Sequence, residues 1–165
     1  MLSEIEASIP ALRRYACALL RSRQDADDLV HKCLVRALDQ LHTRRDDGDI
    51  RAWLFAIMHN VFLSQRRQSR RQVAKPDPEP TADISIAAGQ ETALLFRDVV
   101  GEFYKLPEEQ RQVMLLVTVE DLSYAEAARA LGVPLGTVMS RLSRGRQQLR
   151  QVSQGEPRQT LRRVK

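Results

Sequence analysis

Apolar residues at helical spacing mark two helices in the first part of the chain. In residues 3–21 one stripe carries Ile5, Ile9, Leu12, Ala16 and Leu19. The acids of residues 24–28 suit the start of a second helix, because negative charge there interacts favourably with the helix dipole. The apolar face of this second helix is wide, so we expect part of it to pack inside and part to contact a partner protein. Its apolar positions are Leu29, Val30, Cys33, Leu34, Ala37, Leu38 and Leu41.

A third helix is predicted at residues 50–71, after a polar loop. Trp53, Leu54, Ile57, Met58 and Val61 are expected to face a core, with the single tryptophan as an anchor. Beyond Leu63 the segment turns strongly basic. Arginine at a helix end complements the dipole, but four arginines in six residues exceed that need, so we favour phosphate contact. These arginines are Arg66, Arg67, Arg70 and Arg71.

The helical pattern stops at residues 72–92, where Pro76, Pro78 and Pro80 alternate with acids. This composition predicts a flexible linker. A helix resumes at about residue 93, and Pro107 suits the first turn of the helix that follows it.

A short helix, a tight turn and a second helix from about residue 135 to about 151 are predicted at residues 123–151. Ser123 and Glu126 form a capping box, and Gly132 can end the first helix in a left-handed conformation. The second helix has an apolar stripe and an opposite polar stripe. The apolar stripe carries Leu135, Val138, Leu142 and Leu149, and the polar stripe carries Thr137, Arg141, Arg144 and Gln148.

This arrangement is typical of a helix-turn-helix, whose second helix fits the major groove of DNA. The alternative is an ordinary helical hairpin with a solvated basic face. We favour DNA binding because the first helix is built from small residues that permit a close crossing. The second helix also carries arginine without matching acids.

Composition agrees with an all-α chain. Glycine is scarce, aromatic residues make up 5% of 165 residues, and the net charge is +5, which suits a polyanionic partner. We predict two small helical domains, residues 1–71 and 93–152, joined by the flexible linker at 72–92. The second domain contains the helix-turn-helix, and residues 153–165 form a basic tail.

Other classes of function find no support in the sequence. His31, His42 and His59 form no ligand set with the cysteines, and there is no glycine-rich phosphate loop. We therefore expect no enzyme activity, no metal and no cofactor. Cys17 and Cys33 are predicted to be small buried residues of a reducing cytosol. No apolar run suggests membrane insertion or a signal peptide, so we expect a soluble, cytoplasmic protein.

From about Ile9 to Leu149 the chain resembles the extracytoplasmic-function sigma factors of bacterial RNA polymerase, a branch of the sigma-70 family. Residues 25–38 look like the helix that binds the clamp helices of the polymerase's largest subunit. His31, Lys32 and Cys33 stand where the family usually has Gln-Glu-Thr. The resemblance implies core polymerase contacts at Asp28, Leu29, Lys32 and Arg36.

Residues 51–62, with the basic end beyond them, look like the helix that melts and reads the −10 promoter element. The resemblance implies that the loop at residues 40–50 holds an extruded base. Asn60 would bond a base edge, although a helix-packing hydrogen bond is an equal alternative. The implied −10 contacts are Asn60, Arg66, Arg67 and Arg70.

Residues 106–116 and 122–128 look like the domain that reads the −35 element and contacts the flap of the second-largest polymerase subunit. Gly136 would allow close approach of the backbone to DNA, although it could also simply be a loose helix start. Ser64 and residues 122–126 are similar to the general stress-response branch. The implied −35 contacts are Gly136, Thr137, Ser140, Arg141 and Arg144.

The function that this resemblance implies is transcription initiation with core polymerase at specific promoters. A stand-alone helix-turn-helix regulator is an alternative, but no dimerisation helix is evident. A sigma-like protein that sequesters an anti-sigma factor is another, but the basic DNA face is retained. Because a free initiation factor would be constitutively active, we also expect an anti-sigma factor as a partner.

Overall fold

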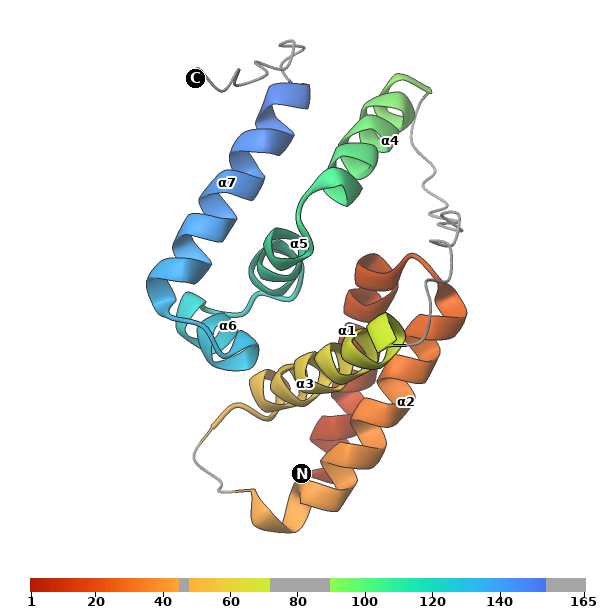
Figure 1. Cartoon of the computed structure of the whole chain (residues 1–165), viewed down its shortest axis with the longest axis vertical. Helices are drawn as coiled ribbons and strands as arrows, with labels where there is room; N and C mark the ends of the chain where they lie inside the picture. The colour runs from red at the N-terminus through yellow and green to blue at the C-terminus, as the bar shows by residue number, and fades with distance from the viewer. Residues whose placement is uncertain (45–47, 72–89, 154–165) are drawn as a thin grey trace.

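The computed structural model describes residues 1–44, 48–71 and 90–153, and within these ranges every regular element is a helix (Figure 1). The all-α prediction with a helix-turn-helix in the second domain is confirmed. The predicted linker up to residue 89 and the tail beyond 153 lie outside the described residues. Residues 90–92, assigned to the linker by sequence, already belong to a helix.

The first domain holds α1 (Leu2–Leu20), α2 (Arg23–Gln40), the short 3-10 turn η1 (Leu41–Thr43) and α3 (Ile50–Arg71). Ser22 caps α2, because its hydroxyl accepts a hydrogen bond from the backbone of Asp25. The three long helices pack against one another through the predicted apolar stripes. Tyr15 on α1 meets Phe55 on α3 edge to face, with ring centres 5.3 Å apart.

The second domain holds α4 (Gln90–Lys105), α5 (Glu108–Met114), the π-helical turn η2 (Leu115–Val119), α6 (Tyr124–Leu131) and α7 (Leu135–Ser153). Helices α4, α5 and α6 all pack against α7. Gly145 permits the close approach of α5, since a Cβ there would lie 2.5 Å from the Sδ of Met114. Gly132 ends α6 with a φ of 62°, as the sequence predicts.

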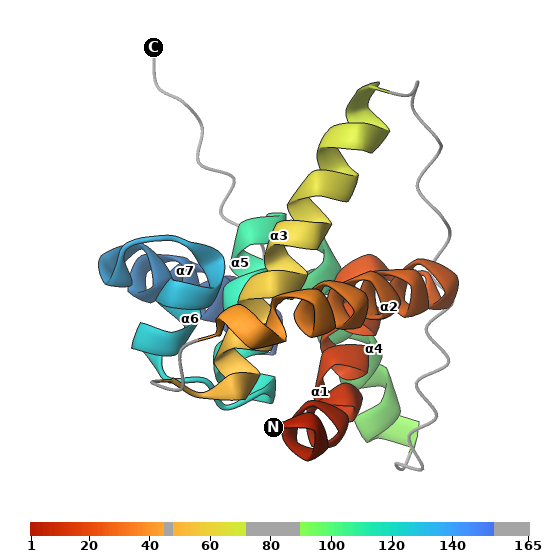
Figure 2. The same cartoon turned by 90° about the horizontal axis from the view of Figure 1, so that it is seen from below.

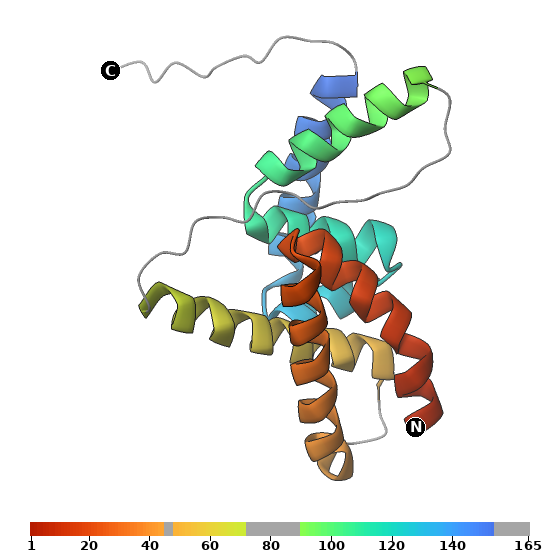
Figure 3. The ribbon, with the colours of Figure 1, turned by 90° about the vertical axis from the view of Figure 1, so that its right-hand side faces the viewer.

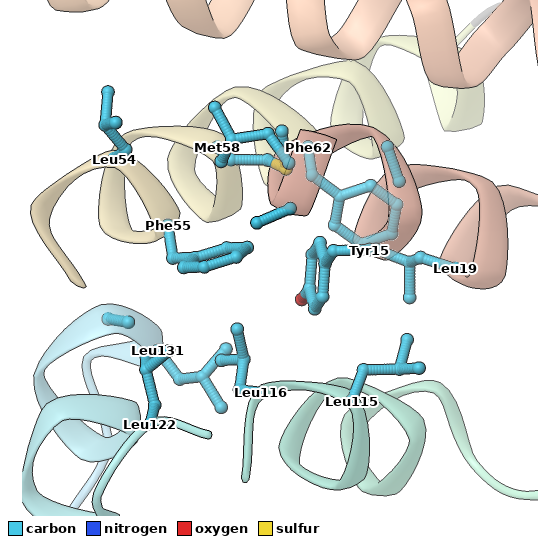
Figure 4. Close-up of a cluster of buried hydrophobic side chains, with 14 of the residues drawn as sticks. Tyr15, Leu19, Leu54, Phe55, Met58, Phe62, Leu115, Leu116, Leu122 and Leu131 are labelled. Atoms are coloured by element: carbon cyan, nitrogen blue, oxygen red, sulfur yellow. The ribbon is translucent and has the colours of Figure 1, made fainter. Parts of the chain in front are cut away.

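The two domains are packed against each other, which the sequence did not predict. Helix α3 contacts α6, and α1 contacts α5 and η2. Figure 4 shows the apolar side chains that meet there. Tyr15, Leu19, Phe55, Met58 and Phe62 come from the first domain, and Leu115, Leu116, Leu122 and Leu131 come from the second.

The two cysteines have different environments, so the expectation that both are buried is wrong for Cys17. Cys33 is buried, and its Sγ donates to the carbonyl of Leu54 at 3.5 Å. Cys17 is exposed because it lies on the solvent side of α1, beside the buried Ala16. Among the described helices, none is long and apolar enough to cross a membrane.

Candidate nucleic-acid interface

The start of α6 is held by two reciprocal hydrogen bonds. The Ser123 hydroxyl accepts from the backbone N–H of Glu126 at 3.2 Å, and the Glu126 carboxylate accepts from the backbone N–H of Ser123 at 2.8 Å. The Ser123 hydroxyl also donates to the Glu126 carboxylate at 2.6 Å. This bond, together with the bond from the Ser123 backbone N–H, holds the pKa of Glu126 below its usual value. The carbonyl of Pro134 then accepts from Thr137 at 2.9 Å, which begins α7. Both helices of the helix-turn-helix are therefore held by hydrogen bonds at their first turns.

Helix α7 buries one side and turns a polar side to solvent. Val138 and Leu142 are buried, as predicted, but Leu135 is 48% exposed because it lies in the first turn, beyond the core. Ser140 and Arg144 are exposed on the outward side. The hydroxyl of Ser140 donates to the carbonyl of Thr137 at 3.1 Å.

Three of the four residues of the predicted polar stripe lie at the flank of α7 instead of facing outward. Thr137, Arg141 and Gln148 are partly buried. The side chain of Arg141 is 24% exposed, and its Nη2 lies 3.9 Å from Oε2 of Glu109 on α5. Arg141 thus leans over α5. Each of the three residues directly precedes a residue of the apolar stripe, which is only about 100° further around the helix. Gly136 is exposed, and nothing lies within 4 Å of a Cβ placed there.

A shallow depression beside the outward side of α7 holds residues that the sequence reasoning missed. Tyr124 at the start of α6 and Met139 on α7 are 37% and 51% exposed. The α7 residues of this surface recur every three or four positions, so helical spacing in the sequence could have identified them. The depression is lined by Tyr124, Met139, Leu142, Ser143, Arg146, Gln147, Arg150 and Gln151.

The basic end of α3 projects beyond the other helices of its domain (Figures 2 and 3). Asn60 and Arg67 are exposed on this helix. The backbone carbonyl of Asn60 accepts from Ser64 at 2.9 Å, and no helix-packing bond of the Asn60 amide is found in the described part of the chain. The Asn60 side chain is therefore accessible at the surface of α3.

Arg66 is engaged by the second domain. Its Nε donates to Oε2 of Glu108 on α5 at 3.0 Å, and its Nη2 also contacts this oxygen. Its guanidinium lies 5.6 Å from the ring centre of Phe62. The side chain of Arg70 and residues 45–47 of the predicted base-holding loop lie outside the described residues.

The surface of α2 presents charged and apolar side chains together. Asp28, Lys32 and Arg36 are exposed, and so are Val35 at 46% and Leu38 at 52%. One part of the apolar face of α2 is therefore buried and another part is exposed.

The predicted polymerase contact at Leu29 is wrong. Its side chain is 0% exposed because it packs among α1 and α3, so it supports α2 from inside.

His59 lies on α3 where the two domains meet. Burial lowers its pKa, and the positive charge of Arg141 on α7 lowers it further, against an opposing effect of Glu108 on α5. In the same region, Glu120 is buried and paired with Arg14 and Arg51. No group of three metal-ligating side chains occurs among the residues that the structure describes.

Comparison with known proteins matches both domains. Residues 5–59 match the sigma-2 domain of PhyR, and residues 104–149 match sigma-70 region 4. The sigma factor EcfG of Rhodopseudomonas palustris strain TIE-1 is 36% identical over 146 residues, which cover 88% of this chain and 81% of EcfG.

Two solved structures are also similar to the chain. One is the sigma factor RpoE in complex with the anti-sigma factor NepR from Bartonella quintana. It has a TM-score of 0.78 and 29% identity, and the match covers 94% of this chain and 97% of RpoE. The other is CnrH in complex with the cytosolic domain of CnrY. It has a TM-score of 0.61 and 26% identity, and the match covers 89% of this chain and 82% of that chain. The chain therefore belongs to the extracytoplasmic-function sigma factors of the sigma-70 family, which direct RNA polymerase to promoters.

Proposed function

We propose that residues 1–71 bind core polymerase and the −10 element, that residues 93–152 bind the −35 element, and that residues 72–92 connect them. The observation that supports these assignments best is the outward polar side of α7, which carries exposed arginines. Helix α6, which precedes α7, is capped at both ends. A rigidly held helix with such a face suits the major groove. The protein would work in the cytoplasm, beside the polymerase.

On α7 we propose two kinds of DNA contact. Ser140 and Arg144 are exposed and would reach base edges, where arginine bonds guanine. Thr137 and Arg141 lie at the flank and would contact phosphates, which position the helix without reading sequence. Gly136 would allow the backbone to approach the duplex.

On α3 we propose that Asn60 bonds an unpaired base of the −10 element, while Arg66, Arg67 and Arg70 contact phosphates. The exposure of Asn60 and Arg67 supports this assignment. Extrusion of a base costs a few kcal/mol, and contacts to the base edge can offset that cost.

For the polymerase, we propose that the exposed face of α2 binds the clamp helices of the largest subunit. Asp28, Lys32 and Arg36 would set charge complementarity around the exposed Val35 and Leu38. The second domain would contact the flap of the second-largest subunit.

We also propose an anti-sigma partner and a place in the general stress-response branch. The likeness to EcfG, to the PhyR sigma-2 domain and to RpoE in its NepR complex supports both.

Run-off transcription with purified core polymerase and a promoter library tests the proposal. The Arg144→Ala variant should lose about tenfold in −35-dependent transcript, the effect of one specific base contact. Arg141→Ala should lose less, because Arg141 lies at the flank beside Glu109. Templates with a scrambled −35 element should show neither loss. If no template gives a promoter-dependent transcript, the proposed function is wrong.

A further inference from the structure

Glu120 is a fully buried carboxylate at the contact between the two domains. It lies in the turn between η2 and α6, and its side chain is 0% exposed. Both charged partners come from the first domain. Arg14 on α1 donates from Nε to Oε1 at 3.2 Å and from Nη2 to Oε2 at 2.8 Å. Arg51 on α3 donates from Nη2 to Oε2 at 2.6 Å.

The second domain gives this carboxylate no side-chain partner in the part of the chain that the structure describes. Only its backbone N–H is bonded there, to the carbonyl of Leu115 at 3.0 Å. A buried charge is costly unless it is paired and hydrogen-bonded. The Glu120 side chain is therefore satisfied only while the domains stay together, and on separation it must be solvated by water.

Apolar residues from both domains also meet at this contact. Tyr15 and Phe55 face Leu116 and Leu122 across the interface (Figure 4). Apolar contact is not directional, whereas a forked arginine–carboxylate pair is strongly directional. The apolar faces thus favour association of the domains, and Glu120 selects the orientation in which they associate.

This orientation uses residues that a promoter requires. Arg66, assigned above to the −10 element, is bonded to Glu108 at the start of α5. Helix α3, which carries Asn60, packs against α6 of the helix-turn-helix.

The spacing of a promoter also excludes this arrangement. The −10 and −35 elements are about 25 base pairs apart, which is about 85 Å of duplex at 3.4 Å per base pair. A compact chain of this length has a radius of gyration of about 15 Å. The two domains cannot lie on both elements while α3 touches α6.

We propose that Glu120, Arg14 and Arg51 form an intramolecular latch that holds the free sigma factor closed and unable to bind a promoter. Binding to core polymerase opens the latch by separating the domains. This inference rests on the proposed function, because it assigns a regulatory role to the same DNA-binding surfaces. It differs from inhibition by an anti-sigma factor, because the latch acts within one chain.

The test compares the full-length wild-type chain with Glu120→Gln and Arg14→Ala. The matched control is Arg13→Ala, which removes an arginine next to Arg14 whose partner, Asp27, lies within the first domain. Small-angle X-ray scattering without polymerase measures opening. Run-off transcription over a range of sigma factor concentrations measures its consequence.

Both latch variants should have a larger radius of gyration than wild type, with unchanged helical circular dichroism. The concentration that gives half-maximal transcript should fall by about tenfold, because apparent affinity scales with the open fraction. Arg13→Ala should match wild type in both measurements. If Glu120→Gln loses helical structure, Arg14→Ala decides the result. The Arg14 side chain is 55% exposed, so its removal leaves the buried core of the domains in place.

Two results would overturn the latch. One is a wild-type chain already as extended as the variants. The other is variants that keep the wild-type dimensions and transcribe no better than wild type. A wild type that never gives a promoter-dependent transcript would instead count against the proposed function, and scattering would still report separately on the latch.

Discussion

Ser123 and Glu126 cap α6 reciprocally, each accepting a hydrogen bond from the other's backbone N–H. Ser123→Ala removes one of these bonds and should lower the free energy of unfolding by about 1 kcal/mol. Chemical denaturation followed by circular dichroism measures this loss. The control is Ser64→Ala, because the exposed Ser64 hydroxyl donates to a carbonyl within its own helix and caps no helix end. Equal stability of the two variants would contradict a capping role.

The pH dependence of the same cap follows from Glu126. Its pKa is lowered in the folded state from the usual value of about 4.5 by its bonds to Ser123. Its stabilisation is therefore present above pH 4.5 and is lost as the pH falls through the lowered value. The difference in stability between wild type and Ser123→Ala should shrink in acid. A difference that is constant from pH 7 to pH 3 would rule out this linkage.

His59 should make the protein less stable in mild acid. Burial, and then the charge of Arg141, lower its pKa from the usual 6.5, while Glu108 acts in the opposite direction. The unfolded chain then binds the proton more readily, so stability falls as the pH drops below about 6.5 toward the lowered value. The His59→Gln variant should show a flatter stability profile between pH 7.5 and 5.5. His31→Gln, at an exposed position, should keep the wild-type slope.

The two thiols should react at different rates. Burial raises the pKa of Cys33 to about 12, so little thiolate forms at pH 8, whereas Cys17 is exposed. A thiol reagent should therefore modify one cysteine rapidly in the native protein and two after denaturation. Cys17→Ser should remove the rapid phase, and Cys33→Ser should keep it. Rapid modification of both thiols in the native protein would show that the Cys33 site is open.

Gly136→Ala separates stability from DNA binding. A methyl group at Gly136 meets nothing within 4 Å, and alanine favours helix by up to about 1 kcal/mol, so stability should hold or rise. If the backbone approaches DNA there, −35-dependent transcription should fall in the run-off assay. The matched control is Gly101→Ala on α4, where a methyl group is equally unobstructed. Unchanged transcription would favour a loose helix start over a DNA contact.

Local pattern was sufficient to find the helices and to place the ends of α6, although it missed the first residues of α4. The capping box at Ser123, the left-handed Gly132 and the apolar stripes are properties of neighbouring residues, so they can be identified without knowing what packs against them. The motifs and their order were likewise sufficient to indicate the family. Each motif lies within one or two helices, so it can be read from the sequence alone.

The tertiary structure decided which side of each helix is covered and by what. Leu29 and Asp28 are adjacent, yet one is buried and the other exposed, since α1 and α3 cover only one side of α2. Arg141 leans over α5 for the same reason. Glu120 lies 106 residues from Arg14 and 69 from Arg51, and no local pattern relates positions so distant. The sequence by itself therefore determined the two domains and their chemistry. Their closed packing was decided only by the tertiary structure, because contacts between distant segments form only when whole helix faces meet.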